Sequence, residues 1–299
     1  MRGLFGLPNI SFMGASFLIT LREGLEVSLV LAILIGYLVK TGRADRVRSV
    51  WLGSGIAAAL CVVGGVAVHL ATDGLHGKSE QAVEGFIAVA AASVLTWMIL
   101  WMHRNAKHMG GQLRAKVDAA ATSAAVAAIA FVAVVREGLE TALFLISAEN
   151  GAASGTQVVA GGLLGLAVAA VIGVLVYRAG SKVDLRTFFR WTGVLLIFFA
   201  AGLVGKAVHE LRELFGFESG FLIDPMWTVQ SGPLSKDGGA VYDFMKGLFG
   251  WAADPERIRV LAYFAYLIPV LWLFLRPGKA VAAAPAEPAE RIADAVGSR

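Results

Sequence analysis

The chain has 299 residues, of which 57% are hydrophobic and 16% are charged, and its mean hydropathy is +0.70. Soluble domains average about 45–50% apolar and about 25% charged residues, so this composition indicates a membrane protein. The net charge of +4 does not indicate nucleic-acid binding, because the basic residues stand in loops between apolar runs. The single cysteine, Cys61, excludes a disulfide framework and a cysteine metal site.

Seven apolar runs approach or exceed the ~20 residues that a membrane-spanning helix needs, and they do not alternate as the strands of a closed β-barrel would. We therefore predict an all-α polytopic membrane protein. Its seven helices are expected at 10–39, 50–70, 82–102, 119–146, 158–177, 191–211 and 258–275.

The first run could be mistaken for a signal peptide, because Arg2 precedes it. The run continues past Glu26 to Val39 and lacks a small-residue cleavage site after a short core. We therefore expect it to be retained as a spanning helix.

The distribution of basic residues predicts the orientation of the chain. Lysine and arginine cluster after the first, third, fifth and seventh predicted helices, whereas the other loops carry few or balance them with acids. Cytoplasmic loops are the ones enriched in these residues. We expect the N-terminus outside and the C-terminus inside.

The pentapeptide Arg22-Glu23-Gly24-Leu25-Glu26 lies in the middle of the first apolar run. It recurs unchanged as Arg136-Glu137-Gly138-Leu139-Glu140 in the fourth. Each charged side chain costs about 2.5–3.5 kcal/mol on insertion at the centre of a spanning helix. Two identical copies of so costly a motif indicate a function, and we interpret them as two halves of one cation site.

The two copies are 114 residues apart, a distance that contains three helices with their loops. Because three is odd, the two motif-bearing helices run in opposite directions, which predicts an inverted repeat with a site near the midplane. We divide the chain into a first three-helix repeat (1–117), a second three-helix repeat (118–214), an extracytoplasmic loop (215–257), a seventh helix without a repeat partner (258–277) and a disordered cytoplasmic tail (278–299).

Helical spacing brings the charged groups of each motif together. Glu23 and Glu26 lie three residues apart and therefore share a face, and Arg22 lies four residues from Glu26. The second copy repeats this arrangement, so Arg136 can pair with Glu140. The glycine of each motif removes a side chain and allows another helix to approach.

Four carboxylates and two guanidiniums at one level leave negative charge for a cation to neutralise. Oxygen ligands favour hard ions such as Fe³⁺, Mg²⁺, Ca²⁺ or Mn²⁺ over Cu⁺ and Zn²⁺. The alternative is that each Arg–Glu pair locks its helix and binds no ion.

A second group of candidate ligands lies at the outer ends of the third and sixth predicted helices. It comprises Glu80, Glu84, His209, Glu210 and Glu213. We interpret it as a funnel that raises the local cation concentration, the alternative being charged helix ends facing headgroups or water. Lys206 stands one turn before Glu210 and is expected to pair with it.

The aromatic and sulfur-containing residues of the third predicted helix look structural. Met98, Met102, Trp97 and Trp101 are interpreted as packing residues and an interfacial aromatic belt, and not as a path for a soft metal.

With these motifs in its first and fourth helices, the chain resembles the iron permease family of high-affinity iron uptake. That family includes the fungal permease partnered by a multicopper oxidase and the bacterial permease of the ferrous/ferric uptake operon. The likeness extends to Glu84-Gly85, Leu95-Thr96, Trp101-Met102 and the segment 207–211.

The resemblance implies that Glu23, Glu26, Glu137 and Glu140 bind iron during translocation and that the two motif arginines, Arg22 and Arg136, support them. It implies a multi-pass protein of the inner (cytoplasmic) membrane whose partners are lipid, iron and a separate oxidase or iron-capture protein. Iron is the transported substrate, and no permanent cofactor is expected. Lead permeases resemble the same family, so the identity of the metal and the oxidation state of iron stay open.

Two other classes of function are compatible with the motifs. An intramembrane carboxylate metalloenzyme would hold a di-metal centre, but helical-bundle sites of that kind usually add Glu-x-x-His motifs, and both copies here are Glu-x-x-Glu. A proton or non-selective cation channel would conduct without competition from metal ions. We predict a transporter and not an enzyme.

Overall fold

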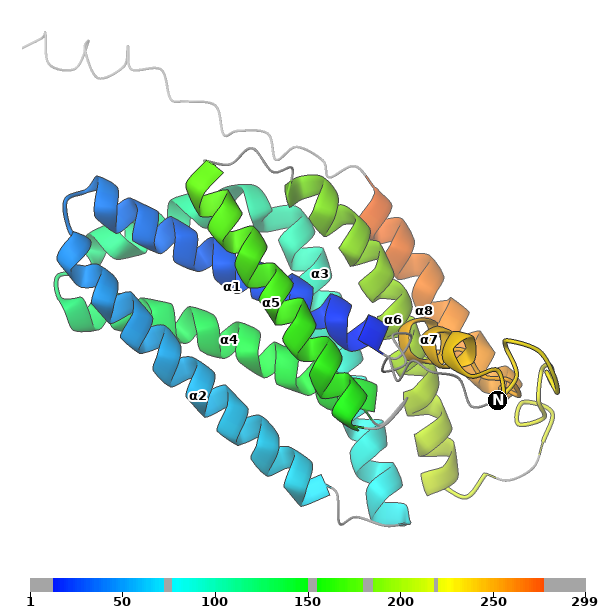
Figure 1. The fold of residues 1–299 in the computed structure, drawn as a ribbon. Coiled ribbons are helices and arrows are strands. Elements are labelled where there is room, and N and C mark those ends of the chain that lie inside the picture. The colour runs from blue at the N-terminus through cyan, green and yellow to red at the C-terminus, as the bar shows by residue number, and fades with distance from the viewer. Residues whose placement is uncertain (1–12, 73–76, 150–154, 180–184, 218–219, 277–299) are drawn as a thin grey trace, which may run out of the picture.

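The computed structural model describes residues 13–72, 77–149, 155–179, 185–217 and 220–276. Within these ranges the chain forms helices and no strand (Figure 1). The elements are α1 (Met13–Lys40), the short 3₁₀ helix η1 (Ala44–Arg46), α2 (Val47–Thr72), α3 (Lys78–Ala119), α4 (Ser123–Glu149), α5 (Gly155–Ala179), α6 (Leu185–Leu214), α7 (Ala240–Phe249) and α8 (Arg257–Leu275). The all-α prediction is confirmed for the described part of the chain.

Five described helical segments are long and apolar enough to cross a membrane: Ala44–Ala71, Lys78–Met102, Val158–Leu175, Phe189–Leu214 and Arg257–Leu275. Helices α1 and α4 have 28 and 27 residues and are also long enough, but each carries the three charges of a pentapeptide. The chain is a multi-pass membrane protein. The count of seven spans, the repeat boundaries and the orientation stay predictions.

Helical structure extends into two of the predicted loops. Helix α3 continues to Ala119, beyond the apolar span that ends at Met102, because Lys, Arg, Gln and Ala sustain a helix where the hydropathy has already fallen. The loop at 215–257 contains α7, whose apolar positions Val241, Phe244 and Leu248 recur at helical spacing. The predicted tail at 278–299 lies outside the described residues.

The helices associate in three main pairs. Helix α1 packs most extensively on α5, α2 on α4, and α3 on α6, while α7 and α8 lie against α6 (Figure 1). The outward faces of α2 and α5 expose large apolar side chains, including Ile56, Leu60, Leu163 and Val171. Such continuous apolar exposure suits contact with lipid.

Clusters of buried side chains stabilise the bundle at different levels, and two of them lie on either side of the pentapeptides. The largest cluster joins α1, α3, α4, α6, α7 and α8 around Ile19, Leu95, Phe144 and Ile197. A second, termed here the turn-side cluster, lies beside the α1–α2 turn. It contains Leu34, Leu38, Val50, Val117, Ala120, Val126 and Ala130. The pentapeptides lie between these clusters along α1 and α4.

Close helix approach occurs at the glycine of each pentapeptide. A Cβ added to Gly24 would lie 2.7 Å from the Ala169 Cβ on α5, and one added to Gly138 would lie 2.5 Å from the Cys61 Sγ on α2. The absence of a side chain therefore seats α1 on α5 and α4 on α2, which fixes how the neighbouring carboxylates are aimed.

Candidate cation site

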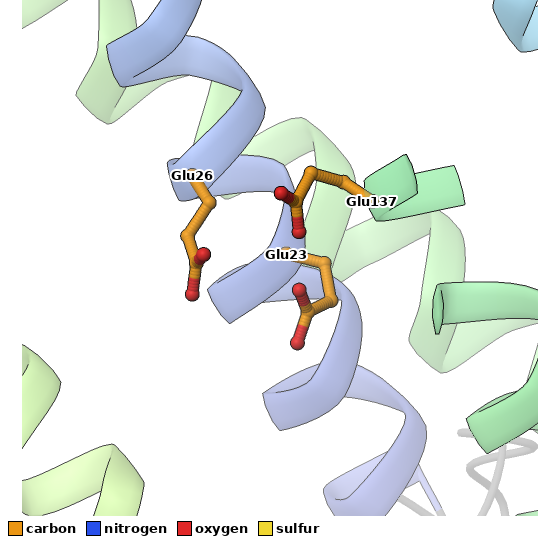
Figure 2. A group of neighbouring side chains, drawn as sticks. All are labelled: Glu23, Glu26 and Glu137. Atoms are coloured by element: carbon orange, nitrogen blue, oxygen red, sulfur yellow. The ribbon is translucent and has the colours of Figure 1, made fainter. Parts of the chain in front are cut away.

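Three buried glutamates from two helices form the candidate site. Glu23 and Glu26 project from one face of α1, and the Glu137 side chain reaches toward them from α4 (Figure 2). One oxygen of each carboxylate lies within 4.8 Å of the others. Within the described residues this is the one group of three or more His, Cys, Asp or Glu side chains whose ligand atoms converge. The two motifs thus meet in the structure although they lie 114 positions apart in the sequence.

Arg22 is buried within this group. Its Nη1 lies 2.7 Å from Glu23 Oε1 and its Nη2 lies 3.0 Å from Glu26 Oε1, so the expected pairing within the motif is present. The guanidinium also donates to two thioether sulfurs of α3, Met98 Sδ at 3.4 Å from Nη1 and Met102 Sδ at 3.1 Å from Nη2. The side chain is only 3% exposed. Two carboxylates of α1 and two sulfurs of α3 thus hold Arg22 in place.

The second arginine has a more open environment. Arg136 Nε lies 3.1 Å from Glu140 Oε1 and 3.7 Å from Glu137 Oε1, which again matches the expected pairing. Its side chain is 38% exposed, and its guanidinium lies 5.2 Å from the ring centroid of Trp101 on α3. Glu140 is thus bound to its own arginine and lies outside the group of three converging carboxylates.

Several carboxylate oxygens of the site are buried without a hydrogen-bond partner among the described residues. They are Glu23 Oε2, Glu26 Oε1, Glu137 Oε2 and Glu140 Oε2; the 3.0 Å contact of Glu26 with Arg22 is an ion pair without hydrogen-bond geometry. A buried polar atom without a partner destabilises the fold. Four carboxylates against two guanidiniums leave an excess of two formal negative charges, which a hard cation bound to these oxygens would offset.

The five outer candidates do not converge in this way. Glu84 is paired with Lys206 at 2.8 Å, so the expectation that Lys206 pairs with Glu210 was wrong: the α3–α6 contact brings a carboxylate closer than the next turn of the same helix does. Glu213 accepts a hydrogen bond from Gln81 at 3.0 Å. Glu210 packs its Cβ near Gly85, while Glu80 is exposed at the start of α3.

His209 belongs to an ion-pair network with the start of α8. Its Nδ1 lies 2.7 Å from Glu256 Oε1, and Arg212 Nη2 lies 3.4 Å from the same oxygen. Burial alone would raise the pKa of Glu256, but the hydrogen bond with His209 and the charge of Arg212 lower it to about 2. Basic side chains thus accompany the acids at this end, and the cation funnel stays a prediction.

Helix α3 contributes side chains to the site that were not predicted from the sequence. Met98 and Met102 are not merely packing residues, since their sulfurs contact Arg22, and Trp101 is not confined to an interfacial belt, since it covers Arg136. The four-residue spacing of the methionines was a signal that both face one neighbour. Nothing in the spacing identified that neighbour as an arginine.

Comparison with known proteins identifies the family. The profile of the Iron permease FTR1 family matches residues 13–277. The chain belongs to this family. The permease is 34% identical over 288 residues to the protein of Yersinia pestis named ferrous iron permease EfeU, a match that covers 94% of this chain and 99% of the relative. It is 35% identical over 279 residues to the protein of the same name from Escherichia coli O6:H1, with coverage of 91% and 99%. No solved structure matches the chain.

Proposed function

We propose that this permease moves iron across the membrane through a site formed by Glu23, Glu26 and Glu137, with Glu140 beside them. The convergence of three buried carboxylates in a member of an iron permease family carries the proposal. Those of their oxygens that lack a hydrogen-bond partner among the described residues suit a hard cation that binds transiently. The relatives are named permeases, which favours a transporter over an enzyme.

Both Fe²⁺ and Fe³⁺ fit oxygen ligands, and the relatives' names favour Fe²⁺. An inside-negative potential assists inward movement by about 2.3 kcal/mol per charge per 100 mV. By the same arithmetic Fe²⁺ gains about 4.6 and Fe³⁺ about 7 kcal/mol at 100 mV. The transmembrane potential alone is therefore a substantial driving force for either ion.

The proposed site lies where the two inverted repeats meet, and matched contacts support this relation. Shifting α1 onto α4 by 114 positions and α2 onto α5 by 108 converts the Gly24–Ala169 contact into Gly138–Cys61. The same shifts convert the contact of Ser28 with Gly173 into that of Ala142 with Gly65. Equivalent pairs at constant offsets are expected of two copies of one three-helix unit.

The remaining parts of the proposal concern topology and partners. We place the N-terminus outside and the permease in the cytoplasmic membrane, on the strength of the basic loops. A separate oxidase or iron-capture protein would deliver the ion at the outer face.

The deciding experiment measures metal uptake into proteoliposomes that contain the purified permease. Fe²⁺, Fe³⁺ held soluble by a weak chelator, and Mn²⁺ are compared at a fixed inside-negative potential. The double variant Glu23→Gln/Glu137→Gln removes two ligands without changing side-chain size, and interactions with a charged group of about 1.5–3 kcal/mol each predict a loss of at least about 100-fold. Asp45→Asn, which removes one exposed carboxylate in η1, is the matched control.

Iron flux that the double variant loses and the control keeps would support the proposal and identify the oxidation state. Flux that survives in the double variant would reject the carboxylate site. Stoichiometric iron binding without flux would favour the metalloenzyme alternative, and ionic current without competition by iron would favour a channel.

A further inference from the structure

A cavity of about 200 Å³ lies between α4, α6, α7 and α8. Its polar lining consists of Ser147, Lys206, His209, Glu210, Lys246 and Arg259. Ser147 follows Glu140 by seven residues on α4, which places the cavity about 10 Å along the helix from the carboxylate site. By the proposed orientation this is the outer end of the bundle.

The lining is predominantly cationic. Among the described lining residues, Lys206, Lys246 and Arg259 face one carboxylate, Glu210. Lys206 is paired with Glu84 at 2.8 Å, so that pair does not neutralise the other two cations. The guanidinium of Arg259 donates a hydrogen bond to the Gly250 carbonyl at 3.4 Å, and although Glu256 and Glu210 attract it, it forms no ion pair within 4 Å in the described part of the chain. The lining thus carries more cationic than anionic side chains, which disfavours a bare metal ion.

Lys246 gives the clearest indication that the cavity suits an anion. Among the described residues it forms no ion pair within 4 Å, although it lies near both Lys206 and Arg259. Burial, together with these two positive neighbours, lowers the pKa of Lys246, while Asp243 on its own helix opposes the shift. An anion in the cavity would stabilise the charged form of Lys246, which is partly buried beside two other cations.

Ser147 adds an independent observation. Its side chain is 3% exposed, and its Oγ has no hydrogen-bond partner among the described residues, yet it lines the cavity. A buried hydroxyl without a partner is an uncommon feature of a folded chain. A ligand oxygen within the cavity would satisfy it.

Close backbone packing holds the cationic groups in place. The Arg259 stem crosses Gly205 of α6, where an added Cβ would lie 3.3 Å from Arg259 Cγ. Gly250, which ends α7 with φ of 67°, lies against Gly202, where an added Cβ would lie 2.8 Å from the Gly250 Cα. These contacts seat α7 and α8 on α6, so the positive lining is built into the fold.

We propose that this cavity binds a multivalent oxyanion, either free or as the chelating part of an iron complex. Ammonium and guanidinium groups with a hydroxyl donor form the usual recognition set for phosphate and carboxylate oxygens. The role of the anion in delivering iron rests on the proposed function, whereas anion binding itself does not. An iron ion that arrives as an anionic complex would be attracted to this cationic lining, whereas the bare ion would not.

The test is calorimetric titration of the full chain in nanodiscs with inorganic phosphate, with citrate and with ferric citrate. Lys246→Gln and Ser147→Ala are expected to weaken binding of the tightest probe at least about 10-fold, and Lys246→Arg to preserve it. Lys40→Gln is the matched control, because Lys40 is exposed at the end of α1, beside the α1–α2 turn. Thermal unfolding of every variant verifies that the fold is retained.

Binding that Lys246→Gln and Ser147→Ala weaken, and Lys40→Gln does not, would support the proposal. Equal binding by all variants, or no binding of any probe, would overturn it. If the unaltered chain binds ferric citrate more tightly than citrate, the ligand is an iron complex. If it binds the two probes with the same affinity, the ligand is a free anion.

Uptake measurements separate this proposal from the proposed function. If the anion delivers iron, Lys246→Gln should lower the ratio of uptake from ferric citrate to uptake of Fe²⁺ at least about 10-fold. Absence of uptake of either form by the unaltered chain would reject the proposed function, while the titration would still decide whether the cavity binds anions.

Discussion

The two pentapeptides are identical in sequence but differ in their surroundings. Arg22 is 3% exposed and is held between two carboxylates and two methionine sulfurs, whereas Arg136 is 38% exposed and lies over Trp101. Helix α3 contributes to this difference, because it presents Met98 and Met102 to Arg22 but Trp101 to Arg136. In the proposed inverted repeat, a helix of the first half would thus make the two halves unequal.

Because of this difference, the two arginines should contribute differently to the stability of the protein. Removing one partner from a buried ion pair typically costs 3–5 kcal/mol, because a charge is left without compensation. The pair of Arg136 with Glu140 is only partly buried, so solvent screens it more and its loss should cost less. We expect the first motif to serve as a fixed support for the carboxylates and the second to adjust more freely when an ion binds.

The largest expected effect is the loss of stability in Arg22→Gln. It should lower the free energy of unfolding by about 3 kcal/mol or more, while Arg136→Gln should lower it by less, because solvent reaches the Arg136 side of its pair with the buried Glu140. Chemical unfolding of the purified protein in detergent provides the measurement, with Arg22→Lys as the variant that keeps the charge. Equal losses for the two glutamine variants would show that their surroundings do not distinguish the motifs.

Overpacking at the motif glycines should produce the next effect. Gly24→Ala and Gly138→Ala should each destabilise the protein by about 1–3 kcal/mol, since the added methyl groups clash with Ala169 and Cys61. Double-mutant cycles with Ala169→Gly and Cys61→Gly should return a favourable coupling energy. The absence of coupling in either cycle would mean that the helices separate instead of clashing.

A smaller effect should appear at Trp101. Trp101→Leu removes its cation–π contact with Arg136, which contributes about 0.5–1 kcal/mol at an exposed site. A double-mutant cycle should therefore couple Trp101 to Arg136 and leave Trp101 uncoupled from Arg22. Coupling to Arg22 instead would reverse the assignment of α3 side chains to the two motifs.

The smallest effect concerns Glu256, which serves as a reference for an ion pair away from both motifs. Its pKa in the folded chain is about 2, below its ordinary value of 4.5. Its contribution to stability is therefore complete above about pH 4.5 and is lost as the pH falls toward 2. With solvent screening this amounts to at most about 1 kcal/mol, or about 2–4 °C in Tm.

Thermal unfolding between pH 5 and pH 3 provides this measurement. The unaltered chain should lose more stability over this range than Glu256→Gln, which has no carboxylate to protonate. Parallel curves would show that the contacts of Glu256 with His209 and Arg212 do not stabilise the charged form.

The sequence was sufficient for features that depend on local spacing. Hydropathy located the long helices, and three- and four-residue spacing identified the Arg22–Glu26 and Arg136–Glu140 pairs that the structure contains. The inference that Glu137 meets Glu23 needed only the repetition of the motif. Each of these follows from helical geometry within one segment or from comparison of two identical segments.

Features that depend on contacts between unlike helices could not be predicted. Lys206 had a carboxylate one turn away on its own helix, and only the packing of α3 on α6 brings Glu84 closer. The cationic cavity likewise combines α6 with α7 and α8, so no single stretch of sequence contains it. The end of α3 was missed for another reason: hydropathy records where the membrane ends, and a helix can continue in water.

The turn-side cluster has a consequence for the movement of ions. Leu34 follows Glu26 by eight residues, so these apolar side chains begin about 12 Å along α1 from the carboxylates. Leu34, Leu38, Val117 and Val126 are fully buried there and join α1 to the ends of α3 and α4. An ion leaving the glutamates toward the α1–α2 turn would exchange carboxylate oxygens for methyl groups, which is prohibitive for a multiply charged species. If the proposed site passes ions toward this turn, α1, α3 and α4 would have to separate at the level of this cluster.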